Sequence, residues 1–305
     1  MKYVVLLFVV LTGAFGASAQ TATPTPRVVV STPSNFPTSR DTDARFRDLN
    51  ALEIRRTKEA GTFKPLAEIE QEFYRKPNKA EIKILAPAPN LLEKYAAFLR
   101  QPDTGIIKLN ADASCVRTPE LVVAKESCLQ YTMPGAGTAY SFRVESYRLP
   151  RLADLILVND VLRTNGAMQQ GIMVNLGDMP LEDVTLQTGG LKYLLDFKPA
   201  EDGDALLETS ERLSRGVKSD GFVYGIGFYV KKPTTYALRS IAYKGTFVRT
   251  VKGVSYNELD FDKRKDIVVA FRLIEKDASG NATILWKILS CQNAPGLKLK
   301  QPEAK

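Results

Sequence analysis

The acidic side chains are the residues of this sequence that offer the clearest chemistry, because the chain contains no histidine. Without histidine the commonest general base and zinc ligand is missing, and Ser-His-Asp and Cys-His catalytic arrangements are excluded. Glycoside hydrolysis needs only two carboxyl groups, either about 5 Å or about 6.5 to 9.5 Å apart. Two clusters could supply such a pair: Asp178, Glu182 and Asp183, or Glu201, Asp202 and Asp204.

Both acidic clusters have a second interpretation that needs no substrate. They adjoin glycine or proline in predicted turns, where acidic residues ordinarily form turns and cap helices. Residues 201–204 also offer oxygen ligands for calcium, but they lack the Asp-x-Asp-x-Asp-Gly spacing of a calcium loop. We therefore predict no catalytic residue, no metal site and no cofactor. A carboxylate-dependent hydrolase acting on glycans is the alternative.

Aromatic residues provide a candidate ligand-binding surface. They gather in two predicted strands and comprise Tyr224, Phe228, Tyr229, Tyr236 and Tyr243. An aromatic-lined β surface can bind sugars or apolar ligands. The same pattern also arises when aromatic side chains fill the core of a sheet, and the sequence favours this second interpretation.

The three cysteines predict one disulfide in an exported chain, and three pairings are possible. Cys115 and Cys128 would close a loop of about 14 residues, which contributes up to roughly 3 kcal/mol in the chain-entropy model. Strand-like residues adjoin both cysteines, and Pro119 between them suits a turn. We predict a disulfide between Cys115 and Cys128, with Cys291 unpaired within the chain.

The strongest structural pattern is a pair of strands at residues 267–275 and 283–290. Apolar residues occupy both sides of each run, as expected for strands that are covered on both faces. Between them, residues 277–281 supply the Asp, Ser, Gly and Asn of a tight loop. We expect this hairpin to lie at the centre of a sheet.

Further strands are predicted from apolar or alternating runs. The first begins at residues 106–107, and the others lie at 140–145, 152–158, 167–176, 222–230 and 236–247. The run at 140–145 should have one face in water, because polar residues alternate with apolar ones. Asn165-Gly166 suits a type I′ hairpin turn between the third and fourth runs. Gly225 and Gly227 indicate a bend or close packing.

Helical patterns are fewer. We predict helices at 65–76 and at 90–101, the second with Asn90 as N-cap and Glu93 completing a capping box. A third, at 204–215, has Asp202 or Asp204 as its cap. Many strands with short links predict a mainly β (α+β) fold: an antiparallel β-sandwich or partly closed barrel with a few helices at the N-terminal end.

The N-terminus predicts export. Residues 1–19 resemble a secretory signal, with Lys2, an apolar run at 4–11 and the small-residue site Ala17-Ser18-Ala19. No later stretch approaches the roughly 20 apolar residues that span a bilayer. We therefore predict a signal peptide at 1–19, a Pro/Thr-rich linker at 20–40, a helical preface at 41–89, a β-rich domain at 90–293 and a disordered tail at 294–305. The expected location is periplasmic or extracellular, with no transmembrane segment after cleavage.

The net charge of +8 is scattered along the chain. Basic clusters at 45–58, 263–265 and 298–300 have acids nearby or lie in a predicted tail, and such runs are ordinarily solvated faces. The candidate partners are an envelope glycan, a lipid surface or a protein. Nucleic acid is not expected as the partner of an exported chain.

Four stretches resemble parts of uncharacterised exported bacterial proteins. They are LEKYAAFL at 92–99, NLGDMPLE at 175–182, TTYALRSI at 234–241 and ILWK at 284–287. The resemblance covers roughly residues 90–290 and implies one domain there, but no activity, ligand or catalytic residue. We predict an exported envelope or periplasmic protein that acts by binding or as an interaction module, with the glycan-acting hydrolase as the alternative.

Overall fold

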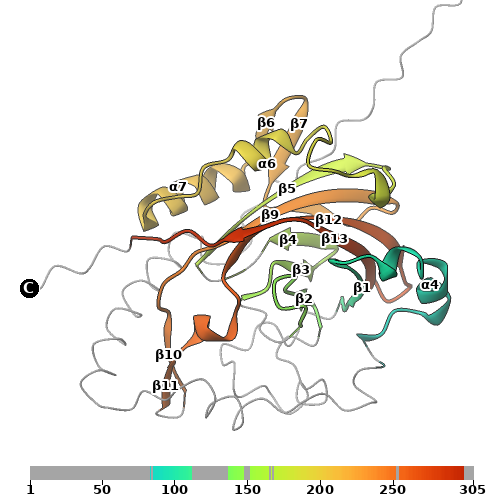
Figure 1. Cartoon of the computed structure of the whole chain (residues 1–305), viewed down its shortest axis with the longest axis horizontal. Helices are drawn as coiled ribbons and strands as arrows, with labels where there is room; N and C mark the ends of the chain where they lie inside the picture. Colours follow the sequence, from blue (N-terminus) through green and yellow to red (C-terminus); the bar gives the residue numbers. More distant parts are fainter. Residues whose placement is uncertain are drawn as a thin grey trace, which may run out of the picture.

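The computed structural model describes residues 83–111 except 84, residues 137–147, and residues 152–298 except 165, 167, 252 and 253. The predicted signal peptide, linker, preface helices and Cys115–Cys128 disulfide lie outside these residues and stay predictions. The described part is a mainly β structure of antiparallel sheets that do not close into a barrel (Figure 1). The predicted fold class is thereby confirmed as a β-sandwich-like α+β fold.

The larger sheet has seven strands in the order β1-β13-β12-β9-β5-β7-β6. In that order the strands span Thr104–Leu109, Ala282–Asn293, Lys265–Lys276, Thr234–Ala242, Gln169–Gly177, Phe222–Gly225 and Val217–Ser219. The predicted hairpin corresponds to β12 and β13, and each of these strands has a neighbour on both sides. Its central position is confirmed.

Alternation along β12 explains why the large sheet is covered on both faces. Val269, Phe271 and Leu273 belong to one buried cluster, whereas Val268 and Ala270 belong to another on the opposite face. Successive side chains of a strand point to opposite faces, so one apolar run supplies both cores. Complete burial of a side chain such as Phe271 stabilises the fold by roughly 1.5 to 3 kcal/mol.

The smaller sheet has four strands in the order β2-β3-β4-β8. These strands span Ala139–Tyr140, Leu155–Val158, Val161–Thr164 and Gly227–Tyr229. Inward side chains such as Leu157, Leu162 and Phe228 pack with Phe271 and Trp286 of the large sheet, so this core lies between the two sheets. A separate hairpin joins β10, Val248–Val251, to β11, Val254–Asn257, and the short helix η5, Glu258–Phe261, follows it.

Short helices cover the face of the large sheet that points away from the small sheet. They are α4 (Pro89–Lys94), η1 (Phe98–Arg100), η4 (Leu181–Asp183), α6 (Lys192–Asp196) and α7 (Gly203–Ser214). Figure 1 shows α6 and α7 on one side of the large sheet and β2 to β4 on the other. The predicted helix at 204–215 is confirmed as α7, and Asp202 caps it by accepting a hydrogen bond from the Ala205 amide at 2.9 Å.

The predicted helix at 90–101 is shorter than expected, and its predicted cap is wrong. The helix begins at Pro89 with Ala88 as N-cap, and no side chain bonds to the cap. Proline is favoured at the first helical position, so Asn90 lies inside the first turn instead of before it. The helix then ends at Lys94, and residues 98–100 form a separate 3₁₀ turn.

The predicted turn at Asn165-Gly166 is also wrong as a hairpin. The tight turn is Asn159-Asp160, where both residues have positive φ (49° and 60°) between the paired residues Val158 and Val161. This is the backbone of a type I′ turn, which Asn and Asp tolerate. Strand β4 then pairs with β8, whereas β5 pairs with β9 and β7, so the Asn165-Gly166 segment joins strands of different sheets.

The predicted strand at 140–145 with one wet face is contradicted. Only Ala139 and Tyr140 lie in β2, and the chain then turns back so that Ser141 pairs with Ser146. Ser141 and Arg143, the residues expected in water, are 4% and 8% exposed. Arg143 is buried because carboxylates within the fold neutralise it, an arrangement that sequence alternation does not reveal.

The two glycines at 225 and 227 mark a bend, as predicted. Strand β7 ends at Gly225 in the large sheet and β8 begins at Gly227 in the small sheet, so the chain changes sheets at Ile226. A Cβ atom at Gly227 would lie 2.9 Å from the carbonyl oxygen of Leu162. The close approach of β4 and β8 therefore requires glycine at this position.

Candidate functional site

The five predicted ligand-binding aromatic residues do not form one surface. Tyr224 lies in the cluster beneath the helices, Phe228 and Tyr236 lie between the sheets, and Tyr243 packs with Ala200 and Ile241, which are also buried. Only Tyr229 among the five is exposed, at 54%. Burial raises the pKa of Tyr224, Tyr236 and Tyr243 to about 12.

Asp178 and Asp202, two of the six acidic residues considered for hydrolysis, have side-chain partners in the structure. Asp178 forms an ion pair with Arg272, with Nη2 and Oδ1 2.5 Å apart. Asp202 caps α7. Lys287 Nζ donates to the backbone oxygen of Glu182 at 3.0 Å. These contacts agree with the interpretation of the clusters as turn and cap residues.

A group of charges closed to solvent connects the turn after β2 with β9 and the segment before β12. The side chains of Arg143 and Asp154 are 0% exposed and form an ion pair, and Arg143 also bonds Asp262 at 2.8 Å. Asp262 in turn accepts from Arg264 at 2.9 Å, and Ser240 donates to Asp154 at 2.5 Å. Because these groups satisfy one another, we interpret the network as a structural junction between both sheets.

Opposing effects set the pKa values of the two arginines in this network. Burial alone would lower the pKa of Arg143, but Asp154 and Asp262 raise it above the usual value. Burial lowers the pKa of Arg264 to about 10, although Asp262 opposes the change, and the charge of Arg143 lowers it further. Both side chains stay charged at neutral pH.

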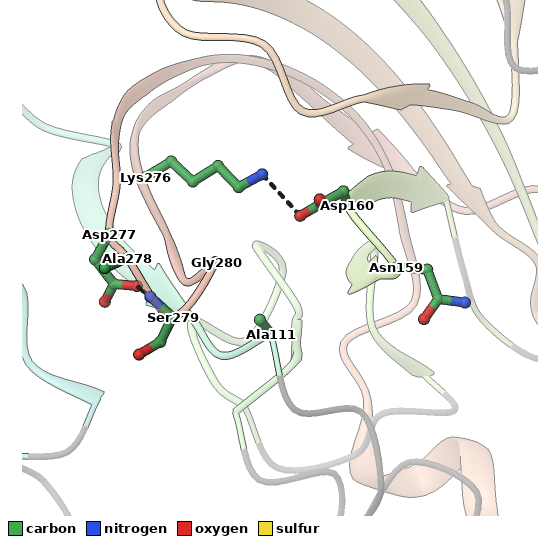
Figure 2. Close-up of a pocket in the computed structure, with 8 residues that line it drawn as sticks. All are labelled: Ala111, Asn159, Asp160, Lys276, Asp277, Ala278, Ser279 and Gly280. Atoms are coloured by element: carbon green, nitrogen blue, oxygen red, sulfur yellow. Dashed lines mark hydrogen bonds and ion pairs between the residues drawn. The ribbon is translucent and has the colours of Figure 1, made fainter.

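An open polar pocket lies between two hairpin turns of different sheets. Its volume is about 650 Å³. The β3–β4 turn forms one wall and the β12–β13 turn forms another, and β1 leads into it. The lining residues are Ala111, Asn159, Asp160, Lys276, Asp277, Ala278, Ser279 and Gly280 (Figure 2).

Each carboxylate of the pocket is paired with a lysine. Lys276 crosses from the β12–β13 turn to the other wall, where its Nζ lies 2.8 Å from Oδ1 of Asp160 (Figure 2). Lys108 of β1 lies 3.4 Å from Oδ2 of Asp277. The pairs are partly open to solvent, with side chains between 27% and 58% exposed. A ligand that enters the pocket therefore meets both charge signs.

Asp277 organises the wall formed by the β12–β13 turn. Its Oδ1 accepts hydrogen bonds from the amides of Ser279 and Asn281, both at 3.0 Å, and its Oδ2 accepts from Asn281 Nδ2 at 2.8 Å. Partial burial would raise the pKa of Asp277, but hydrogen bonds from Asn281 and the charge of Lys108 lower it below the usual value. Asn281 also accepts from the Ala111 amide at 2.9 Å, which ties this turn to the end of β1.

The pocket offers hydrogen-bonding groups of every kind and little apolar surface. Ammonium, carboxylate, hydroxyl and carboxamide groups come from Lys276, Asp160, Ser279 and Asn159. Such a lining suits a ligand rich in hydroxyl groups. The sequence predicts the turn at 277–281 but not its place in a pocket. It does not predict the turn at Asn159-Asp160 that forms the opposite wall. The signal that could have found it is the Asn-Asp pair between Val158 and Val161.

Comparison with known proteins identifies no relative: no protein-family model matches the chain, and neither a curated protein nor a solved structure matches it. Within the described ranges, no three acidic or cysteine side chains gather where they could hold a metal ion. The helices among the described residues are too short or too polar to cross a membrane. Cys291 is an exposed free thiol.

Proposed function

We propose that this protein is an exported protein of the periplasm or cell envelope that binds a hydroxyl-rich ligand, an envelope glycan, and does not transform it. The pocket between the β3–β4 and β12–β13 turns is the proposed binding site. The observation that carries the proposal is the pairing of both pocket carboxylates with lysines. Paired carboxylates bind hydroxyl groups as acceptors while the lysines donate.

The same pairing argues against the alternative, a glycan-acting hydrolase. Both classes of glycosidase need a carboxylic acid that stays protonated until it gives its proton to the leaving group, which requires a raised pKa. The pKa of Asp277 is lowered instead. Asp277 is therefore ionised at neutral pH and cannot act as the general acid of such a pair. The role would fall to Asp160, whose carboxylate is already engaged by Lys276 at 2.8 Å.

The binding proposal is tested with the mature chain on an array of bacterial envelope glycans, followed by calorimetry on the oligosaccharides retained. The variant Lys276→Met should weaken binding, because it removes the ammonium group and leaves Asp160 unpaired. Lys218→Ala, at an exposed position of β6, is the matched control and should bind like wild type. Failure of the array to retain any envelope glycan, or equal binding by both variants, would overturn the proposal.

The hydrolase is distinguished in the same samples by measuring newly formed reducing ends. We expect none. Release of reducing sugar that both Asp160→Asn and Asp277→Asn abolish would replace the binding proposal with the enzymatic one.

A further inference from the structure

Tyr229 is an exposed aromatic residue beside the turn pocket, the pocket between the β3–β4 and β12–β13 turns. It ends strand β8 and lies opposite Val161, the residue that follows Asp160 in the β3–β4 turn. The amide of Val230, the next residue along the chain, donates to the backbone oxygen of Asp160 at 2.7 Å. The end of β8 is thereby bonded directly to the turn that forms one wall of the pocket.

This pairing sets the distance between Tyr229 and the pocket wall. Opposite residues of an antiparallel pair have Cα atoms about 4.5 to 5.5 Å apart, and consecutive Cα atoms are about 3.8 Å apart. The Cα atoms of Tyr229 and Asp160 are therefore separated by at most roughly 9 Å. Adjacent units of one oligosaccharide can reach both the pocket and the tyrosine ring.

The position of Tyr229 is fixed before a ligand arrives. Its carbonyl oxygen accepts a hydrogen bond at 3.2 Å from the hydroxyl group of Tyr236, which is buried between the sheets. Its neighbours Phe228 and Val230 pack into the same core, so alternation along the strand directs the ring of Tyr229 outward, where it is 54% exposed. A tyrosine held in this way offers a rigid contact surface at a low cost in conformational entropy.

Tyr229 supplies the kind of surface that the turn pocket lacks. The residues that line the pocket include no aromatic side chain. Among the described residues, the other exposed large apolar side chains are Leu92 and Leu195, which belong to α4 and α6 on the far face of the large sheet. Small-molecule sites combine apolar or aromatic surface with a few polar groups, and the pocket together with Tyr229 meets that description.

We propose that Tyr229 extends the turn pocket into a site for an oligosaccharide. One sugar unit forms hydrogen bonds in the pocket, and a neighbouring unit stacks on the tyrosine ring. This inference rests on the proposed function and names its ligand class, a chain of pyranose units whose substituents are equatorial. Such a unit carries its polar groups around its rim and C–H groups on its faces, and those C–H groups suit the negative face of an aromatic ring.

The test compares N-acetylglucosamine with its β-1,4-linked trisaccharide, using the mature chain and titration followed by nuclear magnetic resonance. Wild type should bind the trisaccharide at least about tenfold more tightly than the monosaccharide. Tyr229→Ala should lower the affinity for the trisaccharide by about tenfold and leave that for the monosaccharide unchanged, because the monosaccharide occupies the pocket alone. Tyr229→Phe should retain the affinity for the trisaccharide, since it keeps the ring.

The matched control is Leu195→Ala, which truncates an exposed apolar side chain on α6 and should bind both sugars like wild type. Undiminished trisaccharide binding by Tyr229→Ala, or an equal loss for both sugars, would overturn the stacking role. If wild type binds neither sugar, the ligand class named here is wrong, and the envelope glycan array still decides the proposed function. Lys276→Met should weaken the binding of both sugars, so failure of the ring contact and failure of the turn pocket are distinguishable.

Discussion

At the scale of single residues, the charged side chains differ in how fully their neighbours neutralise them. Asp277 is surrounded by donors, Asp154 and Asp262 are buried against arginines, and Arg163 has no partner in the described structure. These three situations have different consequences for stability. The hydrogen bonds and ion pairs of the first two stabilise the folded state, whereas a partly buried cation without a counter-ion is unfavourable.

Asp277 gives a pH-dependent contribution to stability. Because its pKa is lower in the folded protein than in the unfolded chain, its contribution is present above the unfolded pKa of about 3.9 and is lost as the pH falls through the folded value. We expect Asp277→Asn to unfold at lower urea concentration than wild type at pH 7, with the difference shrinking at pH 3. A difference that is independent of pH would contradict this reading.

The N-cap of α7 is a single-residue feature with a predictable effect. Asp202→Ala removes the acceptor for the Ala205 amide and should lower the free energy of unfolding by about 1 kcal/mol. Asp196→Ala is the control, because it removes an acid from an exposed lysine pair on α6 and should change stability by less than about 0.5 kcal/mol. Chemical denaturation of both variants at pH 7 measures the two changes in the free energy of unfolding, and equal changes would contradict the assignment of Asp202 as the cap.

At the scale of elements, the buried charge network connects the turn after β2 with β9 and the segment before β12. Asp154→Ala leaves Arg143 buried without its closest carboxylate, so we expect a loss of about 3 to 5 kcal/mol in the free energy of unfolding. Replacing the exposed Lys192 with Ala should have almost no effect. A loss below about 1 kcal/mol for Asp154→Ala would show that the network is not a structural junction.

The change of sheets at Gly225 to Gly227 is testable with a matched pair of glycines. Gly227→Ala places a Cβ atom 2.9 Å from the Leu162 carbonyl and should destabilise the protein by roughly 1 to 3 kcal/mol. At Gly189 the nearest atom to an added Cβ is 3.7 Å away, an ordinary contact, so Gly189→Ala should be tolerated. Thermal unfolding of both variants gives the comparison.

The sequence predicted those elements whose pattern is local. Alternation over residues 267–290 identified the central hairpin, and the two alternative caps, Asp202 and Asp204, identified the start of α7. It missed β4 because Val161 to Thr164 is a short strand whose partners, β3 and β8, are decided by tertiary packing. It placed Arg143 in water because no local pattern reveals a carboxylate that approaches from Asp262, far along the chain.

The candidate site was even less accessible from sequence. The turn pocket joins residues near positions 111, 160 and 277, and only the last of these segments carried a turn signal that the sequence reasoning recognised. The aromatic residues that did stand out are mostly core, because an aromatic strand residue faces inward or outward according to a register that composition does not specify. Tyr229 is the exception, and its outward position follows from its inward neighbour Phe228.

At the scale of the whole molecule, the two sheets share one core, and the chain passes directly from β7 in the large sheet to β8 in the small sheet. The two sheets should therefore unfold together. We expect far-ultraviolet circular dichroism dominated by β structure, with a single cooperative transition in urea. A helix-dominated spectrum would contradict the fold, and two separated transitions would show that the sheets are independent units. The measurement uses the mature chain.

Trp286 is the sole tryptophan of the chain, and it is 2% exposed between the sheets. Its indole ring lies over Gly105 of the edge strand β1, where an added Cβ would be 2.5 Å from the ring. Tryptophan emission, excited at a wavelength that tyrosine does not absorb, therefore originates from one location, and its maximum reports whether β1 is seated against β13. The protein thus carries a built-in optical probe of its sheet edge, one that needs no label and can be followed in a stopped-flow instrument.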